Sequence, residues 1–100
     1  MQVKIIMNWD IKQGRDQEYF EFVVREFAPG ITRLGLQPTE AWFAVYGKCS
    51  QIMMGGITPD YPTMKTMLDS KEWTDLHERL LQYVTNYTQK IVRFRPDFQL

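Results

Sequence analysis

His77 is the only histidine in this chain of 100 residues, and it follows Trp73 by four positions. Residues four apart lie one turn apart on the same face of a helix, so this spacing predicts that both rings point into the same space. Histidine titrates near neutral pH, which suits it to acid–base chemistry or to ligation of haem iron. The alternative is a histidine at the margin of the core, hydrogen-bonded or half solvated.

A second group of residues could enclose a small molecule. Asn8 would supply a polar anchor, and Trp9, Trp42, Tyr46 and Trp73 would supply aromatic walls. Such a site suits oxygenation without a cofactor, which must hold an electron-rich phenolic substrate and its anion. The alternative for each tryptophan is ordinary core packing, because large aromatic side chains are mostly buried.

Two basic side chains form a third candidate. Arg93 and Arg95 alternate with Val92 and Phe94, so both point to one face of a strand and could hold a carboxylate or a phosphate. The alternative is the solvated face of an edge strand. No glycine-rich phosphate loop, serine-centred elbow or set of metal ligands at useful spacing is present, so we expect no metal site.

The composition excludes several classes of protein. Twelve basic residues balance twelve acidic residues without a basic block, so a nucleic-acid partner is not expected. The single cysteine, Cys49, excludes an intramolecular disulfide. No run of about 18 apolar residues is present to span a membrane, and the N-terminal apolar stretch is too short for a signal peptide. We therefore expect a cytoplasmic protein.

The hydrophobic pattern predicts four strands and two helical regions. We expect strands at residues 2–9, 39–47, 50–57 and 89–95. A first helix should begin near Arg15 and continue, kinked at Pro29, to about Leu34, with Gly35 as its C-terminal cap. The second region should begin after Asp60, pause near Leu68 and restart at Ser70, with a buried stripe from Trp73 to Tyr87.

The order strand, helix, strand, strand, helix, strand is typical of an α+β fold of the ferredoxin-like βαββαβ type. In this fold a four-stranded antiparallel sheet carries both helices on one face. We interpret residues 1–100 as a single domain of this kind.

The predicted strands carry apolar residues on both faces. Trp42 to Tyr46 run without a polar residue, and Ile52 to Met54 are likewise continuous. A sheet face in water normally alternates apolar with polar residues, and two helices cover only one face. Because monomers rarely expose a large apolar patch, the pattern predicts a homodimer in which two sheets pack about a two-fold axis.

Four passages resemble the dimeric α/β-barrel superfamily, within it the antibiotic-biosynthesis-monooxygenase-like (ABM-like) and stress-responsive barrel domains. They are the strand ending in Asn8 and Trp9, Gly14 before an aromatic-rich helix, LGLQPTEAW at residues 34–42, and LDSKEWTDLHERLLQYV at residues 68–84. The likeness extends over nearly the whole chain. It implies the dimeric ferredoxin-like fold, but members include cofactor-independent oxygenases, haem-degrading enzymes and proteins of unknown role, so fold alone does not assign function.

The resemblance also implies candidate roles for particular residues. In the haem-degrading members, an asparagine near the end of the first strand and a histidine on the second helix face the haem, and Asn8 and His77 lie at comparable places. Met67, which we expect to help line the ligand site, lies where those enzymes carry a tryptophan that buckles the haem, a departure that argues against haem degradation.

We therefore expect a dimer that binds a small apolar or aromatic molecule between sheet and helices, with cofactor-independent oxygenation as the favoured chemistry. Asn8 and His77 would be its polar groups, and no cofactor would be required. Haem binding with His77 as axial ligand, and a non-enzymatic interaction module, are the two alternatives.

Overall fold

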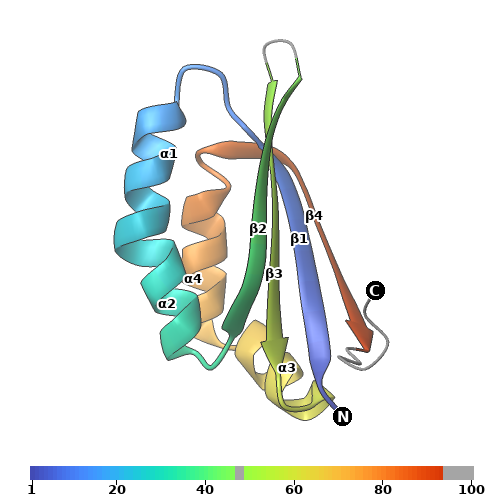
Figure 1. Cartoon of the computed structure of the whole chain (residues 1–100). Coiled ribbons are helices and arrows are strands. Elements are labelled where there is room, and N and C mark those ends of the chain that lie inside the picture. Colours follow the sequence, from blue (N-terminus) through green and yellow to red (C-terminus); the bar gives the residue numbers. More distant parts are fainter. Residues whose placement is uncertain (47–48, 94–100) are drawn as a thin grey trace.

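The computed structural model describes residues 1–46 and 49–93. Within these ranges the chain folds into one sheet and one layer of helices (Figure 1). The elements in chain order are β1 (Val3–Ile11), α1 (Asp16–Phe22), the π-helix η1 (Val23–Phe27), α2 (Ala28–Arg33), β2 (Gln37–Tyr46), β3 (Cys49–Thr58), α3 (Tyr61–Leu68), α4 (Lys71–Leu80) and β4 (Val84–Arg93).

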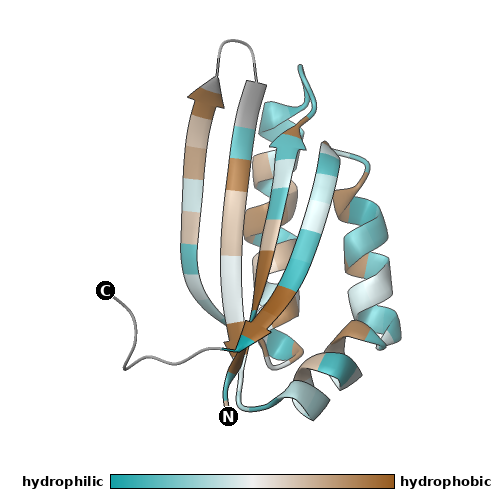
Figure 2. Cartoon of the chain, turned by 90° about the vertical axis from the view of Figure 1, so that its right-hand side faces the viewer, coloured by the Kyte–Doolittle hydropathy of each residue, from teal (hydrophilic) through white to brown (hydrophobic). Residues whose placement is uncertain are grey.

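The sheet confirms the ferredoxin-like prediction. Its strand order is β2-β3-β1-β4, and every neighbouring pair is antiparallel. The two central strands, β1 and β3, are thus not consecutive in the chain, as the βαββαβ pattern requires. Among the described residues, all helices lie on one face of the sheet and leave the other face uncovered (Figures 1 and 2).

The first helical region runs from Asp16 to Arg33 and stays helical past Pro29, as the apolar spacing predicts. The wider π-helical turns of η1 end at Phe27, just before the proline, which cannot donate a backbone hydrogen bond. Gly35 then takes a positive φ of 103°. The N–H of Leu36 reaches back to the carbonyl of Ile31 at 3.0 Å, so the predicted glycine cap is confirmed.

Both predicted caps of the second helical region are confirmed. The carboxylate of Asp60 accepts a hydrogen bond of 2.8 Å from the N–H of Thr63 at the start of α3. The hydroxyl of Ser70 accepts one of 3.1 Å from the N–H of Trp73 at the start of α4. Each side chain satisfies a backbone donor that the first helical turn leaves without a partner.

The predicted C-terminal end of the second helical region is wrong. Helix α4 ends at Leu80, and strand β4 begins at Val84 instead of residue 89. Val84 pairs with Ile11 of β1, so sheet pairing outweighs the helical spacing of apolar residues that continues to Tyr87. The register shifts near Asn86, which has a positive φ of 56° and donates a hydrogen bond of 2.8 Å to Asp10.

The predicted irregularity at the two glycines of β3 is confirmed. The register with β2 shifts between Pro38 and Glu40, directly opposite Gly56 and Gly55. A Cβ atom on Gly56 would lie 2.6 Å from Cγ of the buried Leu36, so the missing side chain makes room for this leucine.

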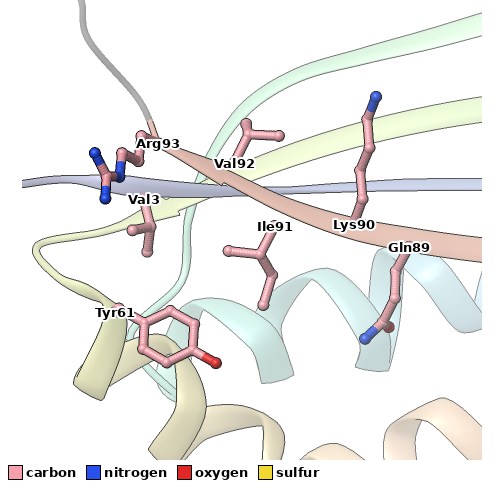
Figure 3. A pocket seen from close by; sticks show the side chains of 7 residues that line it. All are labelled: Val3, Tyr61, Gln89, Lys90, Ile91, Val92 and Arg93. Carbon is pink, nitrogen blue, oxygen red and sulfur yellow. The ribbon is translucent and has the colours of Figure 1, made fainter.

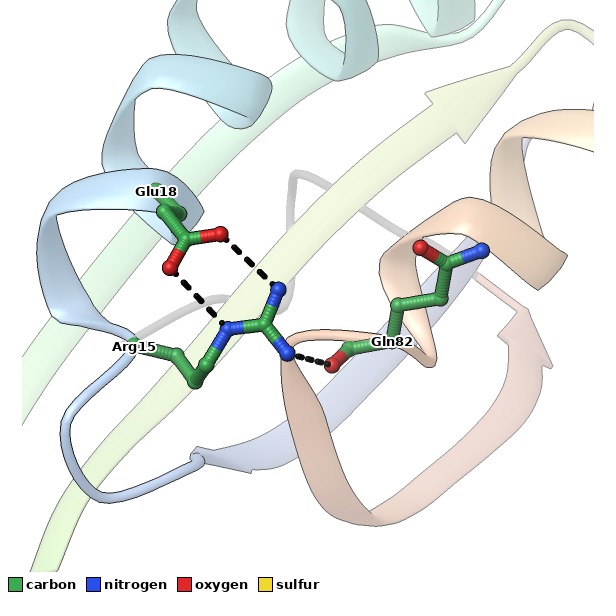
Figure 4. Close-up of polar contacts among 3 residues, drawn as sticks. All are labelled: Arg15, Glu18 and Gln82. Atoms are coloured by element: carbon green, nitrogen blue, oxygen red, sulfur yellow. Dashed lines mark hydrogen bonds and ion pairs between the residues drawn. The ribbon is translucent and has the colours of Figure 1, made fainter.

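A polar contact joins the loop after β1 to the turn before β4 (Figure 4). The guanidinium of Arg15 donates two hydrogen bonds to the carboxylate of Glu18, at 2.9 and 3.2 Å, and one of 3.4 Å to the carbonyl of Gln82. The backbone N–H of Lys12 also donates to the carbonyl of Tyr83 at 2.8 Å. These contacts fix the point at which β4 enters the sheet.

The core lies between the helices and the sheet face they cover. Side chains of β1 that face the helices are buried, and aromatic rings from α1, η1 and α4 pack on them. The largest fully buried side chains are Trp9, Tyr19, Phe27, Ile5, Met7, Ile31, Leu36, Met64 and Leu80.

Candidate functional site

The alternation of β1 separates Asn8 from the other residues expected at the site. Val3, Ile5, Met7 and Trp9 point to the helices and are buried. Successive side chains of a strand point to opposite faces, so Asn8 lies on the uncovered face. His77, on α4, lies on the helix side of the sheet. The structure therefore does not bring Asn8 and His77 together within one chain.

Trp42 lies on the same uncovered face as Asn8. Both residues pair with Met53 of β3, from opposite sides, and the indole of Trp42 is 65% exposed. The next residue, Phe43, points to the helix side and is 54% exposed at the edge of the sheet. Tyr46 ends β2, and its side chain lies outside the part that the structure describes.

Three of the expected site residues are packed in the core. Met67 and Trp73 are buried, and Trp9 is completely inaccessible. The indole of Trp9 donates a hydrogen bond to Tyr19 and stacks on the ring of Tyr87, with the ring centres 5.8 Å apart. Trp9 and Trp73 are therefore core residues, which was the alternative to a role in ligand binding for each tryptophan.

His77 stacks on Trp73, as the four-residue spacing predicts. Their ring centres are 5.5 Å apart and the planes differ by only 6°. The ring of Tyr87, on strand β4, also packs against the imidazole, and the centres of these two rings are 4.5 Å apart. Burial lowers the pKa of His77 below its ordinary value, although the nearby carboxylate of Glu78 opposes this shift. The imidazole is therefore neutral at neutral pH.

The geometry around His77 does not fit an axial ligand of haem through Nε2. This atom is buried and has no hydrogen-bond partner among the described residues. Because Nε2 is buried, an iron atom would have to displace protein atoms to reach it. Within residues 1–46 and 49–93, no group of three or more histidine, cysteine, aspartate or glutamate side chains is placed to hold a metal ion.

A groove runs beside β4, next to the first turn of α3 (Figure 3). Its volume is about 560 Å³. Gln89, Ile91 and Arg93 pair with Met7, Ile5 and Val3 of β1, so they share the helix side of the sheet. The residues that line the groove are Val3, Tyr61, Gln89, Lys90, Ile91, Val92 and Arg93.

Tyr87 links the aromatic core to this groove. Its hydroxyl donates a hydrogen bond of 2.8 Å to Oε1 of Gln89. Burial raises the pKa of Tyr87, so the phenol keeps its proton and remains a donor at physiological pH. His77, Tyr87 and Gln89 thus form a continuous path from α4 to the groove.

Sequence reasoning missed most of this groove. The sequence pattern predicts a binding role only for Arg93, through its alternation with apolar residues. Ile91 and Gln89 continue the same period of two toward the N-terminal end of the strand. Tyr61 could not be found in this way, because it reaches the groove from α3, far away in the sequence.

Comparison with solved structures decides the fold. A NIPSNAP family protein from Agrobacterium tumefaciens superimposes with a TM-score of 0.69 and 18% identity, covering 98% of this chain and 96% of that one. The cofactor-independent oxygenase SnoaB from Streptomyces nogalater gives a TM-score of 0.68 and 12% identity, covering 94% and 93%. The chain therefore shares with these proteins the α+β ferredoxin-like fold of a four-stranded antiparallel sheet and one layer of helices.

A further solved structure shares this fold. An ethyl tert-butyl ether d (EthD) family protein from Bacillus halodurans gives a TM-score of 0.68 and 15% identity, covering 95% of this chain and 100% of that one. At such identities the likeness concerns the fold of the chain and not the activity. No protein-family model matches the chain, and no curated protein matches it. None of the helices in the described part is long and apolar enough to cross a membrane.

Proposed function

We propose that this chain forms a homodimer and binds a small apolar or aromatic molecule in the groove beside β4. The observation that carries the proposal is the groove itself. Its volume of about 560 Å³ lies within the range of roughly 300–1,000 Å³ that is typical of small-molecule sites. Apolar Val3 and Ile91 form part of its wall, and Tyr61, Gln89 and Arg93 add a few polar groups.

The uncovered face of the sheet supports the dimer. Trp42 exposes 65% of its surface there, beside Met53 and Ala44, and Ile6 and Val92 lie on the same face. Burying a large apolar side chain contributes roughly 1.5–3 kcal/mol, so several of them favour association of two such faces. The resemblance of the sequence to the dimeric α/β-barrel superfamily implies the same pairing of two sheets.

The binding proposal is tested by thermal unfolding of the full chain with a panel of phenols, naphthols and quinones. We expect some of them to raise Tm in a concentration-dependent manner, since a ligand that binds only the folded state stabilises it. Ile91→Trp should abolish this response by filling the groove. Val24→Trp, at an exposed site on η1, is the matched control and should keep the response. A panel without effect, or an Ile91→Trp protein that responds as well as the wild type, would refute the proposal.

Cofactor-independent oxygenation of the bound molecule is a second candidate function. It is favoured by the neutral imidazole of His77, which contacts Tyr87, which in turn hydrogen-bonds Gln89 in the groove. The electron-rich phenolic substrate would supply the electrons itself. The product would be a quinone: one atom of O2 would replace a ring hydrogen and become the second carbonyl oxygen, and the other would leave as water with that hydrogen and the hydrogen of the phenol hydroxyl.

Oxygen uptake tests this second function separately from binding. With a phenol that binds, and with a metal chelator present, we expect O2 consumption that His77→Gln slows at least tenfold. Binding without any O2 consumption would leave a non-enzymatic binding protein and would exclude the oxygenase.

A further inference from the structure

The groove contains polar groups at two separate places along its length. Gln89 and Arg93 lie four residues apart on one face of β4, so their Cα atoms are about 13 Å apart at the rise of roughly 3.3 Å per residue of a strand. Ile91 lies between them, and Val3 lies opposite Arg93 on β1. The apolar stretch between the two polar ends is therefore suited to an elongated, flat molecule.

The Gln89 end presents a hydrogen-bond donor. Because the hydroxyl of Tyr87 occupies Oε1 of Gln89, the amide oxygen already has a partner and the NH2 group remains to donate. Figure 3 shows the amide nitrogen on the side of Ile91 and Tyr61, within the groove, and the phenol oxygen of Tyr61 pointing along the groove toward Gln89. Both side chains therefore present hydrogen-bond donors to an oxygen acceptor of a ligand in the groove.

The Arg93 end presents a positive charge. Within residues 1–46 and 49–93, the guanidinium of Arg93 forms no ion pair or hydrogen bond. It lies beside Val3 at the far end of the groove from Gln89, whereas the ammonium group of Lys90 points to the opposite side of the strand (Figure 3). Guanidinium groups bind carboxylates through two parallel hydrogen bonds, so an anionic group of this kind fits here.

We infer that the ligand of this groove is an elongated aromatic carboxylic acid. Its carboxylate pairs with Arg93, its ring lies against Val3 and Ile91, and an oxygen at its opposite end accepts a hydrogen bond from Gln89. Tyr87 acts as a positioning residue, because it orients the amide of Gln89 without touching the ligand. This inference rests on the proposed binding function and names the class of molecule that is bound.

Three matched probes test the inference by calorimetric titration at pH 7: 6-hydroxy-2-naphthoate, 2-naphthol without the carboxylate, and 2-naphthoate without the hydroxyl. We expect 6-hydroxy-2-naphthoate to bind about tenfold more tightly than 2-naphthol, because only its carboxylate can form charge-assisted hydrogen bonds with Arg93. Arg93→Gln should remove that difference and leave the binding of 2-naphthol unchanged. Arg25→Gln, which removes the same charge from the exposed surface of η1, should have no effect.

The role of Tyr87 has its own readout. The wild type should prefer 6-hydroxy-2-naphthoate over 2-naphthoate, because only the former carries the hydroxyl that Gln89 binds. Tyr87→Phe should remove this preference and leave the Kd of 2-naphthoate unaltered. A general loss of stability would instead weaken the binding of both probes. Gln89→Leu, at an exposed position, should give the same pattern without disturbing the core. An unchanged preference in both variants would overturn the role of this pair.

Methyl NMR signals of Ile91 and Val3 report where the probes bind. If all three probes shift these signals with equal affinity, the groove binds ligands but the carboxylate assignment is wrong. If no probe shifts them at millimolar concentration, both the assignment and the proposed function fail. Shifts confined to other methyl groups contradict both in the same way.

Discussion

The indole Nε1 of Trp9 donates a hydrogen bond of 2.9 Å to the hydroxyl oxygen of Tyr19, and both side chains are almost completely buried. This bond joins the central strand β1 to helix α1 inside the core. Burial raises the pKa of Tyr19 to about 12, although the hydrogen bond from Trp9 lowers it in part. The pair is therefore neutral over the whole physiological range and serves as a structural contact.

Tyr19→Phe should destabilise the fold, because it leaves the indole N–H of Trp9 buried without an acceptor. The expected loss is about 1–3 kcal/mol in the free energy of unfolding, measured by urea denaturation. Tyr61→Phe removes a hydroxyl from a half-exposed ring and is the matched control, with an expected change below about 0.5 kcal/mol. Equal losses in the two variants would show that the buried bond has no special weight.

His77 should make the protein less stable in mild acid. Its pKa is lower in the folded state than its ordinary value of 6.5, so the unfolded chain binds the proton more readily. Below pH 6.5 the unfolded state therefore gains protons first, and the free energy of unfolding falls as the pH decreases toward the lower, folded-state pKa. Denaturation curves between pH 7.5 and 5 measure this slope, and His77→Gln should flatten it.

Two carboxylates with lowered pKa values, Glu26 and Asp60, do not interfere with that measurement. Hydrogen bonding from Arg79 lowers the pKa of Glu26, and hydrogen bonding from Thr63 lowers the pKa of Asp60. The stability that these groups contribute is present above their ordinary values of 4.5 and 3.8 and is lost only below them. A slope between pH 7.5 and 5 that persists in His77→Gln would contradict the assignment to His77.

Trp42→Glu should convert the dimer into a monomer. A carboxylate between two facing sheets would be buried without a partner, which is costly. Light scattering should give twice the chain mass of 11.9 kDa for the wild type and the single mass for the variant. Val24→Glu changes another exposed apolar residue, on the helix layer, and should remain dimeric. A wild-type protein that stays monomeric at 100 micromolar would overturn the dimer proposal.

Haemin should not bind through the Nε2 atom of His77. Because this atom is buried and the imidazole ring is held between contacts with Trp73 and Tyr87, we expect no sharpened Soret band when haemin is added to the purified protein. A sharp band that His77→Ala abolishes would show that the ring can turn out of its stack, and it would favour the haem alternative.

Local chemistry makes much of the fold predictable. Asp60, Ser70 and Gly35 cap helices through their own side chains or backbone freedom, so neighbouring residues suffice to place them. The period of two in β1 likewise assigns Trp9 to the core and Asn8 to the opposite face. The first three strands lie within two residues of their predicted ends over the described residues.

The candidate site was less predictable, since it depends on contacts between distant segments. The apolar spacing from Trp73 to Tyr87 fits a helix, but pairing with β1 makes Val84 to Tyr87 part of a strand. This change brings Tyr87 against His77 and Trp9, and it places Gln89, Ile91 and Arg93 beside Tyr61.

The sequence by itself determined the order of the elements, the faces of β1 and the surplus of apolar residues on the strands, because each depends on short-range spacing and side-chain type. Only the tertiary structure decided which polar groups meet. Asn8 and His77 are separated by the sheet, and the groove forms where an edge strand passes the first turn of α3. Contacts of this kind join residues that are far apart in the sequence, so the spacing of residues within one segment does not predict them.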